Sequence, residues 1–73
     1  MEPNGTSANA LSSRQVEVAR LIAEGLSSKQ IAARLGVSAK TANFHRYEIK
    51  RRLGVKSIAE IVRWAIRSGV IEA

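Results

Sequence analysis

Serine and glycine residues divide this chain into four segments of helical length, and this punctuation constrains the fold more than any other feature. The serines that open the segments are Ser12, Ser27, Ser38 and Ser57, and the glycines that close them are Gly25, Gly36, Gly54 and Gly69. Three of the serines precede Gln or Glu by three residues, which is the spacing of a capping box. Glycine is favoured just past a helix end because a left-handed residue there carries no Cβ penalty.

The pattern predicts an all-α domain of four helices, at roughly residues 13–24, 28–35, 39–53 and 58–68. Rotation by about 100° per residue assigns apolar side chains to the inner face of each helix. The expected core residues are Val18, Leu21, Ile22, Ile31, Ala32, Leu35, Ala42, Ile49, Leu53, Ile58, Ile61, Val62, Ala65 and Ile66. Residues 1–10, MEPNGTSANA, show no apolar periodicity, so we expect a disordered tail or linker there and one folded domain over residues 11–73.

Composition excludes several classes of protein. The 73 residues contain no cysteine, so a disulfide framework or a thiolate zinc site cannot supplement the core. No run approaches the roughly 20 apolar residues that a transmembrane helix needs. The start of the chain lacks the basic-then-apolar order of a secretory signal, so a cytoplasmic location is the expectation.

Positive charge is concentrated in one segment. Residues 38–56 contain six Lys or Arg side chains and one Glu, a net charge of +5, whereas the whole chain carries +6. Such a cluster on one element is an electrostatic footprint for phosphate groups. It predicts nucleic acid as the partner rather than a membrane, because the basic face is largely separate from the apolar stripes.

The outer face of the third expected helix carries two aromatic side chains among polar ones. Lys40, Asn43, Phe44, Tyr47 and Arg51 fall within about 100° of one another, opposite the inner face of that helix. A charged helix face is usually only solvated, but exposed aromatic residues reduce solubility unless they meet a partner. In the major groove of DNA, an apolar edge can contact a thymine methyl group and a phenolic hydroxyl can reach a base or a phosphate.

The preceding turn fits a helix–turn–helix unit, which places its second helix in the major groove. Ala32 supplies the small residue that a close helix crossing needs, and Gly36 supplies the turn. The longer strings LSSRQVEV, LIAEGLSSKQIAARLGVS, KTANFHRYEIKRRLGVKS and AEIVRWAIRSGVI resemble the LuxR-type helix–turn–helix domain, also found in GerE and in NarL/FixJ response regulators. The resemblance covers Leu11 to about Ile71.

This resemblance implies a role for each matching residue of the DNA-binding face. Base-reading roles fall on Asn43, Phe44 and Tyr47. Phosphate contacts fall on Lys29, Lys40, Thr41, Arg46 and Lys50, on Ser28 through its hydroxyl or its backbone, and on Arg51 of the same outer face. The family pattern further implies that two copies of the chain form a weak homodimer through the fourth helix. It also implies that the chain is the output domain of a transcription regulator or a stand-alone regulator.

Four residues depart from the family pattern. Ala42 and Asn43 replace the usual valine and lysine, Glu48 replaces a frequent asparagine, and Gln15 replaces a glutamate. Because Asn43 and Phe44 occupy the base-facing positions, a relative's target sequence does not transfer to this chain. Asn43 would favour adenine if it made a bidentate contact. Glu48 brings a negative charge close to the expected phosphates.

Two single residues carry competing interpretations. His45 is the one histidine, and with no cysteine or second histidine near it we expect a hydrogen bond rather than a metal or catalytic role. We therefore expect no metal, no cofactor and no enzymatic activity. Trp64 points about 130° away from the centre of the apolar stripe of the fourth helix. It is expected outside the centre of the core, either at a partly buried flank or as the anchor of a symmetric dimer.

An alternative function remains open at this stage. A similar trihelical unit forms the promoter-recognising end of sigma factors, where contact with RNA polymerase matters as much as contact with DNA. On that hypothesis the outer apolar residues serve a protein partner. The fourth helix and the LGVKS turn fit the LuxR-type arrangement better.

Overall fold

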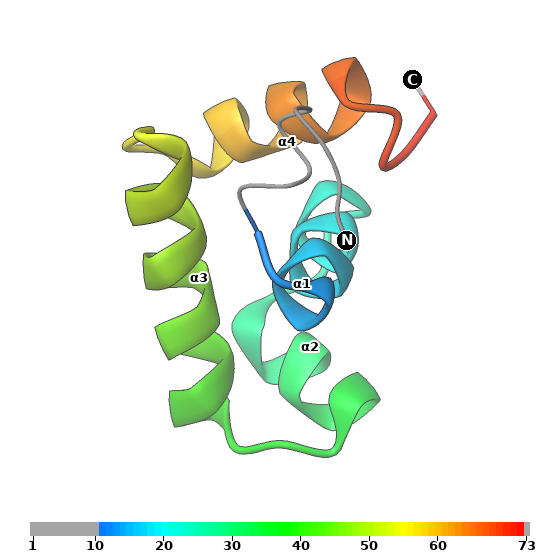
Figure 1. Cartoon of the computed structure of the whole chain (residues 1–73). Helices are drawn as coiled ribbons and strands as arrows, with labels where there is room; N and C mark the ends of the chain where they lie inside the picture. The colour runs from blue at the N-terminus through cyan, green and yellow to red at the C-terminus, as the bar shows by residue number, and fades with distance from the viewer. Residues whose placement is uncertain (1–10, 73) are drawn as a thin grey trace.

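Four helices begin and end where the serines and glycines predict. A computed structural model describes residues 11–72, and its helices are α1 (Ser13–Ala23), α2 (Ser28–Leu35), α3 (Ala39–Leu53) and α4 (Ile58–Arg67) (Figure 1). The expected bounds are confirmed for α2 and α3, whereas α1 and α4 each end one residue early. No strand occurs within the described residues, so the all-α class is confirmed. The tail predicted at residues 1–10 lies outside them.

The capping boxes form as the sequence predicts. The Ser12 hydroxyl accepts from the Gln15 backbone N–H at 3.1 Å, and the Gln15 side chain accepts from the Ser12 N–H at 3.2 Å. Ser27 with Gln30 and Ser57 with Glu60 form the same reciprocal pairs. Gln15 is 6% exposed. A neutral amide suits this buried position, because an unpaired carboxylate would cost far more to bury than an amide that is hydrogen-bonded.

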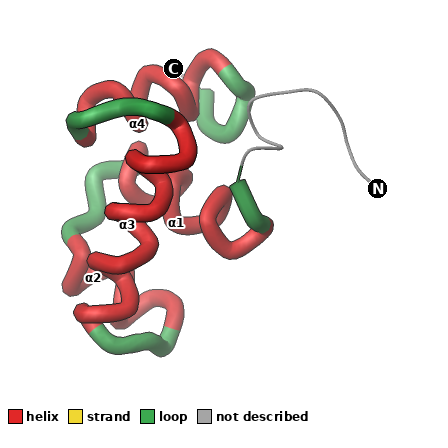
Figure 2. Tube along the Cα trace, turned by 60° about the vertical axis from the view of Figure 1, so that its left-hand side comes forward, coloured by secondary structure: helices red, strands yellow, loops and turns green. Residues whose placement is uncertain are grey.

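The helices enclose one apolar core with α1 at its centre. α1 contacts each of the other three helices, while α2 packs mainly on α3, and α4 crosses one end of the α1–α3 pair (Figures 1 and 2). The largest fully buried side chains are Leu21, Ile31, Ile49, Ile61 and Val18. Every helix therefore contributes to the core, which holds α3 against the body of the molecule and leaves its outer face uncovered.

Trp64 lies in the core, and the expectation that it lies outside the centre is wrong. Its side chain is 4% exposed, whereas Ile66, which was expected to be buried, is 40% exposed. The buried residues Ile61, Trp64 and Ala65 have the i, i+3, i+4 spacing of one helix face. The inward face is thus rotated toward Trp64 from the centre of the apolar stripe, because α1 receives that edge of α4.

Within residues 11–72 no helix has the length and apolar character that crossing a bilayer requires, and the longest helix, α3, has 15 residues.

Candidate nucleic-acid interface

A short, well-determined turn fixes the angle between α2 and α3. Gly36 adopts φ 70°, in the left-handed region, and the Val37 N–H donates to the carbonyl oxygen of Ala32 at 3.0 Å. Ser38 then caps α3 through a 3.0 Å bond from the Thr41 N–H to the Ser38 Oγ. Ala32 is buried, so its small side chain permits a close approach of the two helices. This is the geometry of a helix–turn–helix unit.

The three predicted base-reading residues all lie on the outer face of α3. Phe44 is 57% exposed and Tyr47 is 61% exposed, and Asn43 beside them is also exposed. Among the described residues, Phe44, Tyr47 and Ile66 are the exposed large apolar side chains. Two of the three therefore share one helix face, on the element that carries most of the positive charge. The face combines apolar edges, an amide and a phenolic hydroxyl, which are the groups that contact base edges.

Arg46 and Ser28 join the two helices of the unit across their interface. The Arg46 guanidinium donates from Nη1 to the Ser28 Oγ at 2.9 Å, between residues 18 positions apart in sequence. Both residues were predicted to contact phosphate, and the structure brings them together. A guanidinium has five N–H donors, so Arg46 keeps donors for a phosphate while Ser28 orients it.

The first turns of α2 and α3 present further donors. Lys29 and Lys40 are exposed, and neither forms an ion pair among the described residues. The Ser38 hydroxyl donates to the Thr41 Oγ1 at 3.0 Å. Because Thr41 accepts in that bond, its own hydroxyl hydrogen is available to an incoming acceptor. The predicted phosphate contacts from Lys29, Lys40 and Thr41 are thus accessible, Lys29 at the start of α2 and the other two at the start of α3.

Arg51 is held in place by Glu48. Its Nη2 donates to Oε1 of Glu48 at 2.8 Å and its Nε donates to Oε2 at 3.3 Å, while Arg52 Nε lies 3.8 Å from the same Oε1. The hydrogen bond from Arg51 holds the pKa of the Glu48 carboxyl below its ordinary value, against the opposing effect of desolvation. The negative charge that the sequence places beside the expected phosphates is therefore offset by two arginines of its own helix.

The C-terminal end of α3 carries a second cluster of basic residues. The assignments made from the sequence include Lys50 and Arg51 of this cluster but not Lys56. A hollow of about 320 Å³ is lined by Tyr47, Lys50, Arg51, Val55 and Lys56. We call it the C-terminal hollow. Lys56 belongs to the basic segment recognised from composition, but no pattern assigned it a contact, because it lies in the turn beyond the helix.

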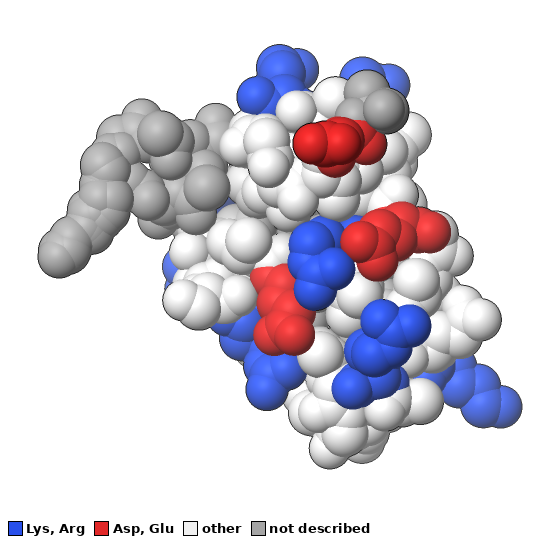
Figure 3. Space-filling model, turned by 90° about the vertical axis from the view of Figure 1, so that its right-hand side faces the viewer, with Lys and Arg blue, Asp and Glu red and all other residues white. Residues whose placement is uncertain are grey.

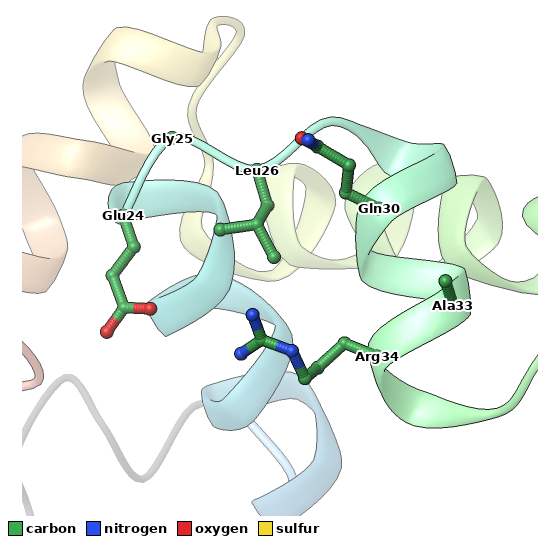
Figure 4. A pocket seen from close by; sticks show the side chains of 6 residues that line it. All are labelled: Glu24, Gly25, Leu26, Gln30, Ala33 and Arg34. Atoms are coloured by element: carbon green, nitrogen blue, oxygen red, sulfur yellow. The ribbon is translucent and has the colours of Figure 1, made fainter.

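The rest of the surface differs from the α3 face in charge. Basic and acidic side chains alternate on the side turned away from α3 (Figure 3). A larger hollow of about 680 Å³ lies between the end of α1 and α2, with a lining of opposite charges and polar groups (Figure 4). Its lining residues are Glu24, Gly25, Leu26, Gln30, Ala33 and Arg34. Since Glu24 is paired with Arg20 at 3.1 Å and Arg34 is close by, this hollow lacks the single sign of charge that a polyanion needs.

The burial of Nδ1 of His45 and of the Trp64 side chain changes what was expected of each residue. His45 Nδ1 and Trp64 Nε1 are buried atoms without a hydrogen-bond partner in the structure, so the hydrogen bond expected at His45 is not formed by Nδ1. The described residues hold no group of three or more His, Cys, Asp or Glu side chains suited to a metal. Trp64 is too buried to offer a surface to a second copy. The exposed large apolar side chain of α4 is instead Ile66, and Ile58 and Val62, eight and four residues before it, are partly buried on the same helix edge.

Comparison with known proteins identifies the class that this geometry defines. Residues 9–65 match the family described as bacterial regulatory proteins, luxR family. The chain belongs to this family, and it is a helix–turn–helix DNA-binding domain of the transcription-regulator type. The resemblance inferred from the sequence is thereby confirmed.

Similar full-length relatives are considerably longer than this chain. It is 42% identical over 62 residues to the oxygen regulatory protein NreC of Staphylococcus aureus strain JH9, and equally to NreC of strains USA300 and Mu3. The aligned part covers 85% of this chain and 29% of each relative. The chain therefore corresponds to less than a third of the length of these relatives.

Proposed function

We propose that this chain reads specific sequences in double-stranded DNA, with α3 lying in the major groove. The observation that carries the proposal is the joint exposure of Phe44 and Tyr47, at 57% and 61%, on a helix face bordered by basic groups. Base edges in the major groove present apolar and polar groups side by side, so they can contact both the aromatic rings and the polar groups of this face. The cations at both ends of α3 favour a polyanion as that partner.

The roles divide between reading and positioning. Asn43, Phe44 and Tyr47 are proposed to contact base edges, because they project from the centre of the exposed face. Phosphate contacts are proposed for Ser28, Lys29, Lys40, Thr41, Arg46, Lys50 and Arg51. Phosphate contacts fix the register of a protein on the duplex and supply most of the affinity, whereas base contacts supply the choice of sequence.

A weak homodimer through α4 is proposed as the DNA-bound form. Ile66 is 40% exposed, and together with the partly buried Ile58 and Val62 at four-residue spacing it forms an apolar edge along α4, which we call the α4 edge. This edge takes the place of Trp64 as the proposed contact. A symmetric pair would place two copies of α3 on a palindromic site.

We further propose that the chain is the output domain of a cytoplasmic transcription regulator, since relatives such as NreC are about three times its length. The competing hypothesis, a sigma-factor-like contact with RNA polymerase, assigns Phe44 and Tyr47 to a protein partner. The basic groups that border these aromatics on the same helix support DNA instead.

Two substitutions test the division of roles. Lys40→Ala should weaken binding to every duplex and reduce the slope of log K against log salt by about 0.9, because one phosphate contact is lost.

Tyr47→Ala should change which base is preferred at one position of the site, because an altered base contact costs about 1 to 3 kcal/mol of discrimination. Fluorescence-anisotropy titrations on a panel of single-base variants measure both effects. An unchanged preference in Tyr47→Ala, together with an altered one in Lys40→Ala, would contradict the assignment.

A further inference from the structure

The C-terminal hollow combines an apolar floor with a rim of one charge sign. Tyr47 and Val55 supply apolar surface, and Lys50, Arg51 and Lys56 supply three cations. Neither Lys50 nor Lys56 forms an ion pair within residues 11–72. No carboxylate lines the hollow. The charges of Lys50 and Lys56 are therefore available to an external anion, whereas the charge of Arg51 is shared with Glu48.

The rim of the hollow is preorganised by contacts of its own. The two hydrogen bonds from Arg51 to Glu48 fix the guanidinium on one side. On the other side, the Val55 N–H donates to the Lys50 carbonyl oxygen at 3.0 Å, and the Lys56 N–H donates to Oε1 of Glu60 at 2.8 Å. The cap of α4 thus holds the backbone of the turn that carries Lys56. A fixed backbone lowers the entropy lost when an anion is bound.

The hollow lies far enough along α3 from Lys40 to span a DNA groove. Lys40 precedes Lys50 by ten residues and Arg51 by eleven, which correspond to about 15 to 17 Å along a helix axis. The major groove is about 12 Å wide. If the start of α3 contacts the backbone of one strand, its end lies near the backbone of the other. Tyr47 borders both the base-reading face and the hollow, so the two surfaces are continuous.

We propose that the C-terminal hollow binds one phosphate group of the DNA backbone, on the strand opposite to the one contacted near the α2–α3 turn. Lys56 is the new contact residue, and it acts with Lys50 and Arg51. This inference rests on the proposed function, because it takes DNA as the source of the phosphate. It adds a second backbone contact site, so that α3 is held from both edges of the groove.

The test compares Lys56→Gln with Arg67→Gln in the 73-residue chain. Both changes remove one positive charge from an exposed side chain, but Arg67 lies at the end of α4, outside the hollow. The probe is the duplex most enriched from a random library by the unmodified chain. Lys56→Gln should lower the salt slope by about 0.9 and weaken binding about fivefold at roughly 0.15 M salt, as loss of one phosphate contact implies. Arg67→Gln should leave the slope unchanged.

A scan with single methylphosphonate linkages, which carry no charge, locates the phosphate. One linkage should weaken binding by the unmodified chain and have no effect on binding by Lys56→Gln. It should lie on the strand opposite to the linkage whose effect is lost in Lys40→Ala. Equal salt slopes for Lys56→Gln and Arg67→Gln would overturn the proposal, and would leave the hollow to an anion other than DNA. Failure of the unmodified chain to bind any duplex would instead remove the proposed function, and this inference with it.

Discussion

Buried tryptophan is the main feature of this domain at the scale of single residues. Trp64 is 4% exposed and its Nε1 has no hydrogen-bond partner in the structure. An unsatisfied buried N–H costs about 1 to 3 kcal/mol, so the packing of the indole ring must outweigh that penalty. The residue contributes to stability by filling the space between α4 and the rest of the core.

Trp64→Ala should therefore destabilise the fold by about 3 to 5 kcal/mol, the usual cost of truncating a buried aromatic residue. Trp64→Phe should cost less, since it keeps most of the ring volume and removes the unpaired N–H. Urea unfolding followed by circular dichroism measures both. A Trp64→Ala variant with an unchanged unfolding midpoint would show that the indole does not pack as described.

The same residue shows where sequence reasoning fails. α4 has apolar side chains over a wide arc of its surface, among them Ile58, Ile61, Val62, Ala65 and Ile66. Periodicity locates the centre of such an arc, but the edge that faces inward is chosen by the shape of α1, which lies about 40 residues earlier in the chain. By contrast, the exposure of Phe44 and Tyr47 could be predicted, because α3 has a narrow apolar stripe and a clear polar face.

At the scale of elements, the caps determine where the helices begin. They were predictable because each is a contact between residues three apart. The capping box of α4 contains an ionisable group, the Glu60 carboxyl. Glu60 accepts from the Lys56 N–H at 2.8 Å and from the Ser57 N–H at 3.1 Å. The bond from Lys56, followed by those from Ser57, lowers the pKa of the Glu60 carboxyl below its ordinary value of 4.5. By contrast, the pairing of Arg46 with Ser28 joins two helices and could not be read from local spacing.

The depressed pKa of Glu60 predicts a pH-dependent stability. A carboxyl group whose pKa is lower in the folded state stabilises the fold above its unfolded pKa, and that contribution is lost as the pH falls through the folded value. The unmodified chain should therefore be more stable than Glu60→Gln at pH 7, and the difference should shrink below pH 4.5. Glutamine keeps the accepting oxygen, so the comparison isolates the charge. Thermal unfolding across this range measures it, and a pH-independent difference would contradict the prediction.

At the scale of the whole molecule, the excess positive charge is concentrated on the α3 face, and exposed apolar side chains lie both on that face and on α4. α3 and the turn after it carry the excess of positive charge, the opposite side alternates in sign (Figure 3), and the α4 edge exposes Ile66. The proposed DNA-binding face on α3 and the proposed dimer contact on α4 are therefore different surfaces. Composition predicted the basic segment, but only the fold shows that Lys56 joins the end of α3.

The proposed dimer predicts an effect that depends on the DNA rather than on the fold. Ile66→Ser removes apolar surface from the α4 edge without changing the charge, and Ile66 is exposed enough that stability should change little. Binding to a duplex with two half-sites should fall more than binding to a duplex with one half-site, because the loss of dimer contact matters only when two copies are bound. Equal losses on the two duplexes would count against the α4 edge as the interface.

The central claim, that this domain reads DNA sequence through α3, is tested most directly by selection from a random duplex library. At about 0.15 M salt, where non-specific binding is weak, the chain should enrich a motif. A two-fold-symmetric motif is the expected result, and a lone half-site would retain sequence reading by α3 while removing the dimer. Absence of any enriched motif, with binding that disappears as the salt concentration rises, would contradict the claim and leave only a basic surface.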